Sequence, residues 1–84
     1  MPTREELALL VRTTISDVLG TGTEEVREQT SLSADHDIDS LELMEIGARL
    51  ERSLQVRIEV EDLTAAQTVG QAIDLLAARA GERS

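Results

Sequence analysis

The chain has 84 residues, a formal net charge of −9 at pH 7, and no cysteine, phenylalanine, tryptophan or tyrosine. The lack of cysteine excludes a disulfide framework and a thiolate metal site, and a single histidine argues against zinc. The negative charge disfavours nucleic acid and anionic membrane surfaces as partners and favours basic proteins. A core without aromatic side chains must be built from aliphatic residues, which favours packed helices over a sheet.

The length predicts a single domain spanning residues 1–84 with a small core. The first six residues are polar and acidic, and no long apolar run follows them. We therefore expect neither a signal peptide nor a membrane span, and a cytoplasmic protein. For so acidic a small chain, a monomer is the expected oligomeric state.

The first expected helix covers about residues 4–19. Thr3 and Glu6 form a capping-box pattern at its start, and Gly20 follows its last apolar residue as a C-terminal cap. Its apolar residues recur at helical spacing: Leu7, Leu10, Val11, Ile15 and Val18. A long polar connection follows at about 21–39, and we expect its apolar residues Val26 and Leu32 to anchor it to the core.

The second expected helix runs from about Ser40 to Ser53. Asp39 suits the N-cap position, and Glu42 completes a capping-box pattern. The buried stripe of this helix would contain Leu43, Ile46, Leu50 and Leu54. Gly47 costs up to ~1 kcal/mol inside a helix, and a close helix contact would explain it. Ser40 would thus lie at the positively polarised end of the helix, which suits a phosphate ester.

The last expected helix covers about residues 69–80. Thr68 and Gln71 give a capping pattern, and residues 81–84 are expected to be a frayed tail. The buried stripe would be Val69, Ile73, Leu76 and Ala80. The alternating segment 54–58 is too short for a sheet and has no partner strand in the sequence. The expected class is therefore all-α, a small helical bundle.

The segment Asp39-Ser40-Leu41, followed by Glu42-Leu43-Met44-Glu45-Ile46, resembles the attachment motif of acyl carrier proteins. The resemblance extends over nearly the whole chain. It implies that Ser40 is esterified once by 4′-phosphopantetheine, whose thiol then holds an acyl group. It also implies four helices, with a short third helix at about 60–66. The family's long first loop often holds a helical turn, which residues 24–28 would match.

The chain departs from the family pattern just before the serine. His36 and Asp37 stand where the family commonly has leucine and glycine. This change concerns the anchoring and the backbone path of the loop, and it leaves the attachment chemistry untouched. We expect His36 itself to be an exposed loop residue without a catalytic role.

The resemblance also implies that the second helix is the main recognition surface, through Asp39, Leu41, Glu42, Met44 and Glu45. Residues 31–62 hold nine acidic residues and three arginines, so they carry −6 of the net charge of −9. Such a concentration should steer the chain onto basic partner surfaces. On residue type alone these acids could be an ordinary solvated face, and Met44 could equally pack in the core. Arg52 and Ser53 stand where many family members carry acids.

Two simpler interpretations can be weighed from the sequence. Serine is common at helix starts, but Asp39 already supplies a better cap, so capping does not require Ser40. Asp35, Asp37 and Asp39 alternate as in a calcium-binding loop of the EF-hand type. That loop needs glycine and glutamate where this chain has Ser40 and Ile46. We therefore expect neither a metal site nor catalytic residues.

The expected function is that of a free-standing acyl carrier protein, not an enzyme. It would present acyl thioesters on the 4′-phosphopantetheine of Ser40 to polyketide or fatty acid biosynthetic enzymes, and its aliphatic core could open to shelter the acyl chain. The lack of lysine, the His36-Asp37 departure and the arginines of the second helix favour polyketide or other specialised metabolism. Expected partners are a phosphopantetheinyl transferase and basic ketosynthases or acyltransferases. The alternatives are a peptidyl or aminoacyl carrier, and an unmodified acidic interaction module that would need no serine at position 40.

Overall fold

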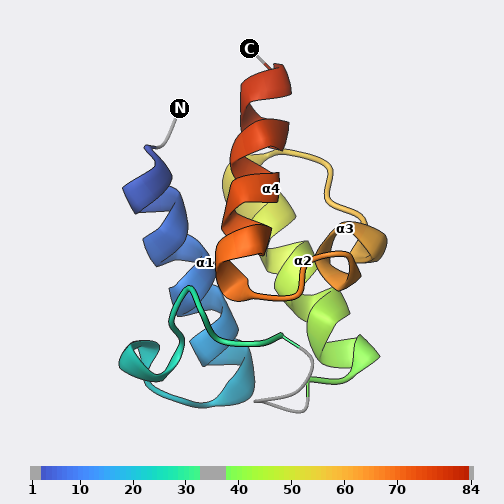
Figure 1. Cartoon of the computed structure of the whole chain (residues 1–84). Helices are drawn as coiled ribbons and strands as arrows, with labels where there is room; N and C mark the ends of the chain where they lie inside the picture. The colour runs from blue at the N-terminus through green and yellow to red at the C-terminus, as the bar shows by residue number, and fades with distance from the viewer. Residues whose placement is uncertain (1–2, 33–37, 84) are drawn as a thin grey trace.

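The computed structural model describes residues 3–32 and 38–83. In chain order they form helix α1 (Arg4–Leu19), the 3-10 helix η1 (Thr23–Glu25), and helices α2 (Ser40–Leu54), α3 (Val60–Thr64) and α4 (Val69–Arg83) (Figure 1). In this part of the chain there is no strand, and β-type pairing is limited to one bridge between Ser31 and Thr68. The predicted all-α class, with three long helices and a short third helix, is confirmed.

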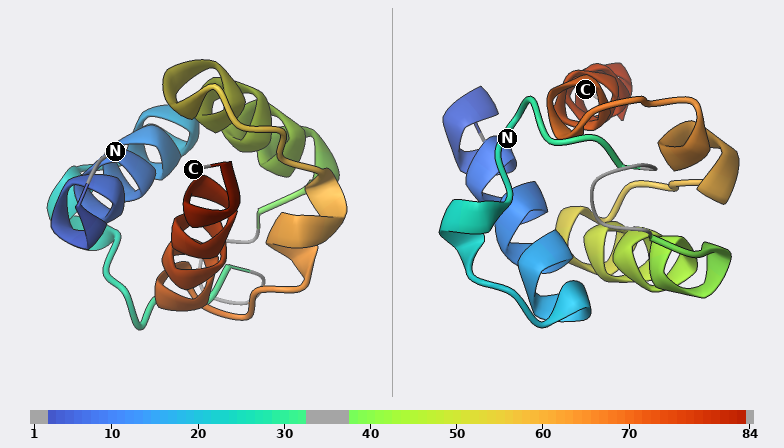
Figure 2. Two further views of the ribbon diagram at one scale, coloured as in Figure 1. Left: turned by 90° about the horizontal axis from the view of Figure 1, so that it is seen from above. Right: turned by 60° about the horizontal axis from the view of Figure 1, so that its bottom comes forward.

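The three long helices surround the core, and α1 contacts both α2 and α4 (Figures 1 and 2). Helix α1 runs antiparallel to α4, so the two chain ends lie at the same end of the molecule (Figure 1). The short helix α3 packs against α2 and α4. Helix α2 begins at the end of the molecule away from both chain ends (Figure 1).

The core is aliphatic throughout. The buried side chains come from all four α-helices and from both long connections: Leu7, Ala8, Val11, Ile15, Val26, Leu32, Ile46, Leu50, Ile58, Leu63, Val69, Ala72, Ile73 and Leu76. The predicted stripes of the long helices supply most of them, while Leu10, Val18, Leu43 and Leu54 are partly buried against this core. Apolar spacing alone therefore oriented each long helix correctly.

The two ends of α1 follow the predicted local signals. The Thr3 hydroxyl accepts a hydrogen bond from the Glu6 amide at 3.1 Å, and the Glu6 carboxylate accepts one from the Thr3 amide at 2.9 Å. Gly20 ends the helix with φ +74°, a left-handed conformation that costs glycine little. The expected bounds of 4–19 agree with the structure.

The first connection is anchored by its two apolar residues, as predicted. Val26 is fully buried and Leu32 is 5% exposed. The helical turn lies at η1, one residue earlier than expected and shorter. From α1, the Arg12 guanidinium donates hydrogen bonds to the carbonyls of Val26 and Thr23.

Backbone hydrogen bonds attach the same connection to the segment that opens α4. The Leu32 amide donates to the Gln67 carbonyl at 3.1 Å, and the Val69 amide donates to Thr30 at 3.0 Å. The Gly70 amide donates to the Glu28 carbonyl at 2.8 Å. A β-carbon at position 70 would lie 3.2 Å from that carbonyl oxygen, so a side chain there would crowd this contact.

The C-terminal part differs from expectation in two places. Helix α3 ends at Thr64, so the predicted range of 60–66 was too long. Helix α4 continues to Arg83, so the predicted end near residue 80 and the frayed tail from Gly81 were wrong. A single glycine near a helix end costs only about 1 kcal/mol relative to alanine, which does not force the helix to stop.

Arg4 links the start of α1 to two other elements. Its guanidinium lies 2.9 Å from a carboxylate oxygen of Glu28 in the first connection, and 2.9 Å from one of Asp74 in α4. The hydrogen bonds that Arg4 donates to Glu28 and Asp74 raise the pKa of Arg4, and the bond from Arg4 lowers the pKa of Glu28. These groups are largely exposed, so solvent screens each pair.

We predict that this link contributes stability only above the acidic range. The folded-state pKa of Glu28 lies below its ordinary value of 4.5, so its contribution is present above about that pH and is lost as the pH falls through the lowered value. Arg4→Gln should therefore lower the thermal midpoint at pH 7, and the difference from the parent should shrink on acidification. Arg27→Gln is the control, because Arg27 forms no ion pair within the described residues. An equal, pH-independent effect of both substitutions would contradict the prediction.

The burial of two leucines predicts different effects of their substitution on the free energy of unfolding. Leu50 is fully buried and Leu9 is 57% exposed. Leu50→Ala should reduce the free energy of unfolding by roughly 2–5 kcal/mol, because it removes buried methyl groups and leaves a cavity. Leu9→Ala should change it by no more than about 0.5 kcal/mol. Urea denaturation followed by circular dichroism measures both, and similar losses for the two variants would show that the core is placed wrongly.

Candidate functional site

The candidate site is the start of α2, where Asp39 and Glu42 form two reciprocal capping hydrogen bonds. The Asp39 carboxylate accepts a hydrogen bond from the Glu42 amide at 2.8 Å, and the Asp39 amide donates to the Glu42 carboxylate at 3.1 Å. The Leu43 amide donates to the Asp39 carbonyl at 3.0 Å. The first two bonds form the predicted capping box, the third is the first backbone bond of the helix, and Ser40 is the first helical residue.

The location of Ser40 suits a phosphate ester. The amide groups of a first helical turn carry partial positive charge and favour an anion beside them. The two neighbours of Ser40, Asp39 and Leu41, are exposed, so this turn of the helix lies at the surface.

Four of the predicted recognition residues follow on α2, and they differ in exposure. Leu41 is 76% exposed and Met44 is 56% exposed. For Met44, the structure thus favours the outward interpretation over core packing. Glu45 is exposed, whereas Glu42 is partly covered and its carboxylate is used in the cap. Leu41 and Met44 therefore form an apolar surface beside the helix start, next to Glu45.

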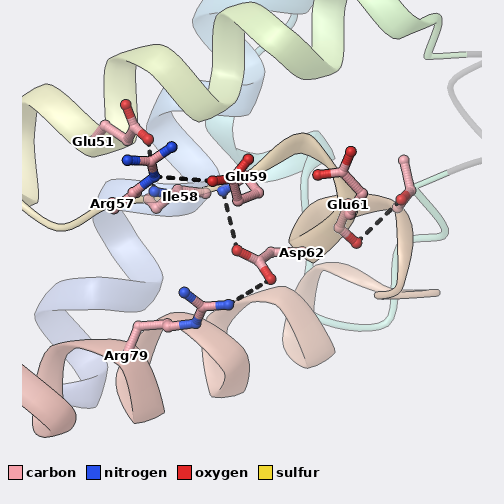
Figure 3. A network of polar contacts seen from close by, with 8 residues as sticks. Glu51, Arg57, Ile58, Glu59, Glu61, Asp62 and Arg79 are labelled. Atoms are coloured by element: carbon pink, nitrogen blue, oxygen red, sulfur yellow. Dashed lines mark hydrogen bonds and ion pairs between the residues drawn. The ribbon is translucent and has the colours of Figure 1, made fainter.

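Two acidic residues after Glu45, Glu51 and Asp62, are used in internal contacts. Glu51 on α2 accepts a hydrogen bond from the Ile58 amide at 2.6 Å (Figure 3). Asp62 on α3 accepts a bond from Arg79 of α4 at 2.7 Å and another from the Glu59 amide at 3.0 Å. The acidic concentration predicted over residues 31–62 is thus not one continuous docking surface. Part of it holds the segment between α2 and α4 together.

One further pair lies on this segment. The Arg57 guanidinium donates to the Glu59 carboxylate at 2.9 Å, and this bond raises the pKa of Arg57 (Figure 3). The Arg57 side chain is 84% exposed, so the pair is worth little to stability.

A cavity of about 290 Å³ opens between α2 and the segment that follows it. Its lining includes the apolar residues Leu43, Met44 and Ile58. Gly47 also faces this region: a β-carbon there would lie 3.4 Å from a methyl carbon of Leu63 on α3. The glycine inside the helix therefore coincides with the close approach of α3, as expected.

The structure gives no sign of a second kind of site within residues 3–32 and 38–83. No group of three metal-ligating side chains is found there. Asp35, His36 and Asp37 lie outside the described residues, so the expectations about the calcium-like spacing and the Leu-Gly replacement concern a part the structure does not describe. Among the described helices, none is long and apolar enough to cross a membrane.

Sequence reasoning missed three contributions to this region. The Glu45–Arg49 ion pair, at 2.7 Å, has a recognisable signal in the i, i+4 spacing of opposite charges. The bond from Ile58 to Glu51 and the pair of Asp62 with Arg79 join residues far apart in the chain. No local sequence pattern predicts these two contacts.

Comparison with known proteins agrees with the geometry. A family model described as "Phosphopantetheine attachment site" matches residues 10–76. An acyl carrier protein of Acidothermus cellulolyticus is 32% identical over 74 residues, which are 88% of this chain and 88% of the relative. One of Petrotoga mobilis is 38% identical over 74 residues, 88% of this chain and 87% of the relative. The meromycolate extension acyl carrier protein of Mycolicibacterium smegmatis is 37% identical over 71 residues, 84% and 72% of the two chains.

The family match covers α2, α3 and most of α1 and α4, so it includes the candidate site and its supports. A serine at a capped, surface-lying helix start is a suitable acceptor for the phosphodiester that the family carries. The chain belongs to the acyl carrier protein family, whose members are non-catalytic carriers of a covalent 4′-phosphopantetheine.

Proposed function

We propose that Ser40 is the attachment residue and that the chain is a free-standing carrier of acyl thioesters for polyketide or fatty acid biosynthesis. The observation that carries this proposal is the position of Ser40 as first residue of α2, directly after the Asp39 cap. A phosphopantetheinyl transferase would move the 4′-phosphopantetheinyl group from coenzyme A to the Ser40 hydroxyl. The thiol of the bound group supplies the chemistry, because it holds the acyl group as a reactive thioester.

The residues of the chain then have supporting roles in this proposal. The Asp39–Glu42 capping box holds the attachment residue at the helix end. Leu41 and Met44 offer apolar contact to a partner, and methionine adapts to several partners. Asp39, Glu42 and Glu45 supply negative charge for basic surfaces on the transferase and on ketosynthases or acyltransferases. The cavity beside Met44 and Ile58 gives the acyl chain a sheltered place.

The relatives favour an acyl carrier over a peptidyl or aminoacyl carrier, because the matched proteins bear the name acyl carrier protein. One group of relatives is named for meromycolate extension, which fits acyl chain elongation. For this chain we favour polyketide or other specialised metabolism, on the basis of its lack of lysine and the arginines of α2. We further propose that residues 1–84 form one carrier domain that acts as a cytoplasmic monomer.

The attachment residue can be tested directly by intact mass. We expect the purified chain, incubated with coenzyme A, magnesium and a broad-specificity phosphopantetheinyl transferase, to gain the mass of one phosphopantetheine group. Ser40→Ala should gain nothing. Ser53→Ala is the matched control, because Ser53 is an exposed serine on the same helix, and it should be modified like the parent.

Two outcomes would count against the proposal. A folded parent chain that gains no mass would favour an unmodified interaction module. A mass gain that persists in Ser40→Ala would place the attachment on another residue. If Ser40 is modified as expected, mass spectrometry of the chain isolated from its own host would identify the acyl group that it carries.

A further inference from the structure

The outward side of α2 changes charge along its length. One line of exposed residues follows the helix at spacings of four, three and four: Leu41, Glu45, Ala48 and Arg52. Glu45 lies on the half nearer the attachment residue, and Arg52 lies in the last turn. They are seven positions apart, which is roughly 10 Å along a helix axis. The helix therefore presents one acidic and one basic position to any partner that covers it.

The half of α2 that contains Arg49 and Arg52 is basic, and a tertiary contact engages its one acid, Glu51. Glu51, which precedes Arg52 in the chain, accepts a hydrogen bond from the Ile58 amide at 2.6 Å and is only partly exposed, so the exposed charged residues here are Arg49 and Arg52. Arg49 is paired with Glu45 at 2.7 Å. Within the described parts of the chain, Arg52 has no ion-pair partner, so its charge is available to a partner protein.

A groove of about 690 Å³ runs beside this line, between α1 and α2. The charged residues in its lining are Asp17 from α1 and Glu45, Arg49 and Arg52 from α2. The groove lining thus contains as many arginines as acids, whereas the chain as a whole has a net charge of −9. Ser53, the residue after Arg52, also lines the groove. A partner carboxylate is repelled by the chain as a whole, but it finds complementary groups here.

Helix stability alone offers another reason for Arg52. A cation in the last turn interacts favourably with the partial negative charge of a helix C-terminus. That effect needs only one cation near the end of the helix. It accounts neither for Arg49 one turn earlier nor for the withdrawal of Glu51 from the outward side.

We infer that α2 docks onto a partner enzyme whose surface is itself bipolar. A basic side chain of that enzyme faces Glu45, and a carboxylate, placed roughly 10 Å further along the helix, faces Arg52 at the end of the groove. This inference rests on the proposed function, because it takes α2 as the docking helix. It makes Arg52 a residue that selects among partner enzymes: a partner with only basic residues along this face is disfavoured.

Two charge reversals test this arrangement. The probe is the ketosynthase of the source organism that turns over the parent phosphopantetheinylated chain with the highest kcat/KM. Glu45→Arg and Arg52→Glu should each raise the KM of that enzyme for the carrier by roughly threefold to tenfold, because each reversal removes an exposed ion pair and also places two like charges opposite each other. The two substitutions shift the net charge in opposite directions. A purely basic partner surface therefore predicts opposite effects, with a lower KM for Arg52→Glu.

Arg27→Glu is the matched control. It makes the same charge change in the segment after η1, which lies on the other side of α1 from α2 (Figures 1 and 2). Its KM should stay close to that of the parent, and Arg52→Lys should also retain the parent KM. Arg52→Gln should raise the KM less than Arg52→Glu, and it replaces the reversal if that variant unfolds by circular dichroism.

The outcomes separate this inference from the attachment proposal. Intact mass first establishes that each variant is fully phosphopantetheinylated. A parent chain that gains no mass would contradict the attachment proposal. A fully modified Arg52→Glu whose KM is unchanged, lower, or equal to that of Arg27→Glu would overturn the bipolar docking surface alone.

Discussion

Burial of Ile46 and Leu50 determines which side chains of α2 face outward. Both side chains are almost completely excluded from solvent and fix the rotation of the helix about its axis. Because a helix repeats every 3.6 residues, this rotation turns Leu41, Glu45 and Arg52 outward and sets Met44 at the edge of a cavity. The surface that a partner meets is thus a consequence of packing on the opposite side of the same helix.

The net charge of the chain is a poor measure of the charge at this surface. Glu28 is bound by Arg4, Asp62 by Arg79, and Glu51 by a backbone amide. The first two of these pairs join the first connection to α1 and the short helix α3 to α4. The acids left on the outward side of α2 are concentrated in its first half. Long-range steering follows the total charge, whereas orientation on a partner follows the local pattern.

The long first connection shows how a small aliphatic core can hold an extended loop. Two apolar residues, Val26 and Leu32, bury their side chains, and backbone bonds to Gln67 and from Gly70 hold the backbone between them. In the described part of the connection, α1 and the segment that opens α4 supply partners for several of its backbone polar groups. The connection precedes the start of α2 in the chain, so its anchoring supports the region of the candidate site.

Local sequence determined the helices, their orientation and the candidate site. Apolar spacing identified the buried sides of α1, α2 and α4, because a helix must bury one stripe. The Asp39–Glu42 spacing placed Ser40 at a helix start, because capping involves only neighbouring residues. Only the tertiary structure decided which acids face a partner. The contacts of Glu51, Asp62 and Arg4 span 7, 17 and 24 or more residues, and no short pattern encodes such pairings. The outward position of Met44 depends on the packing of Ile46 and Leu50 against the core.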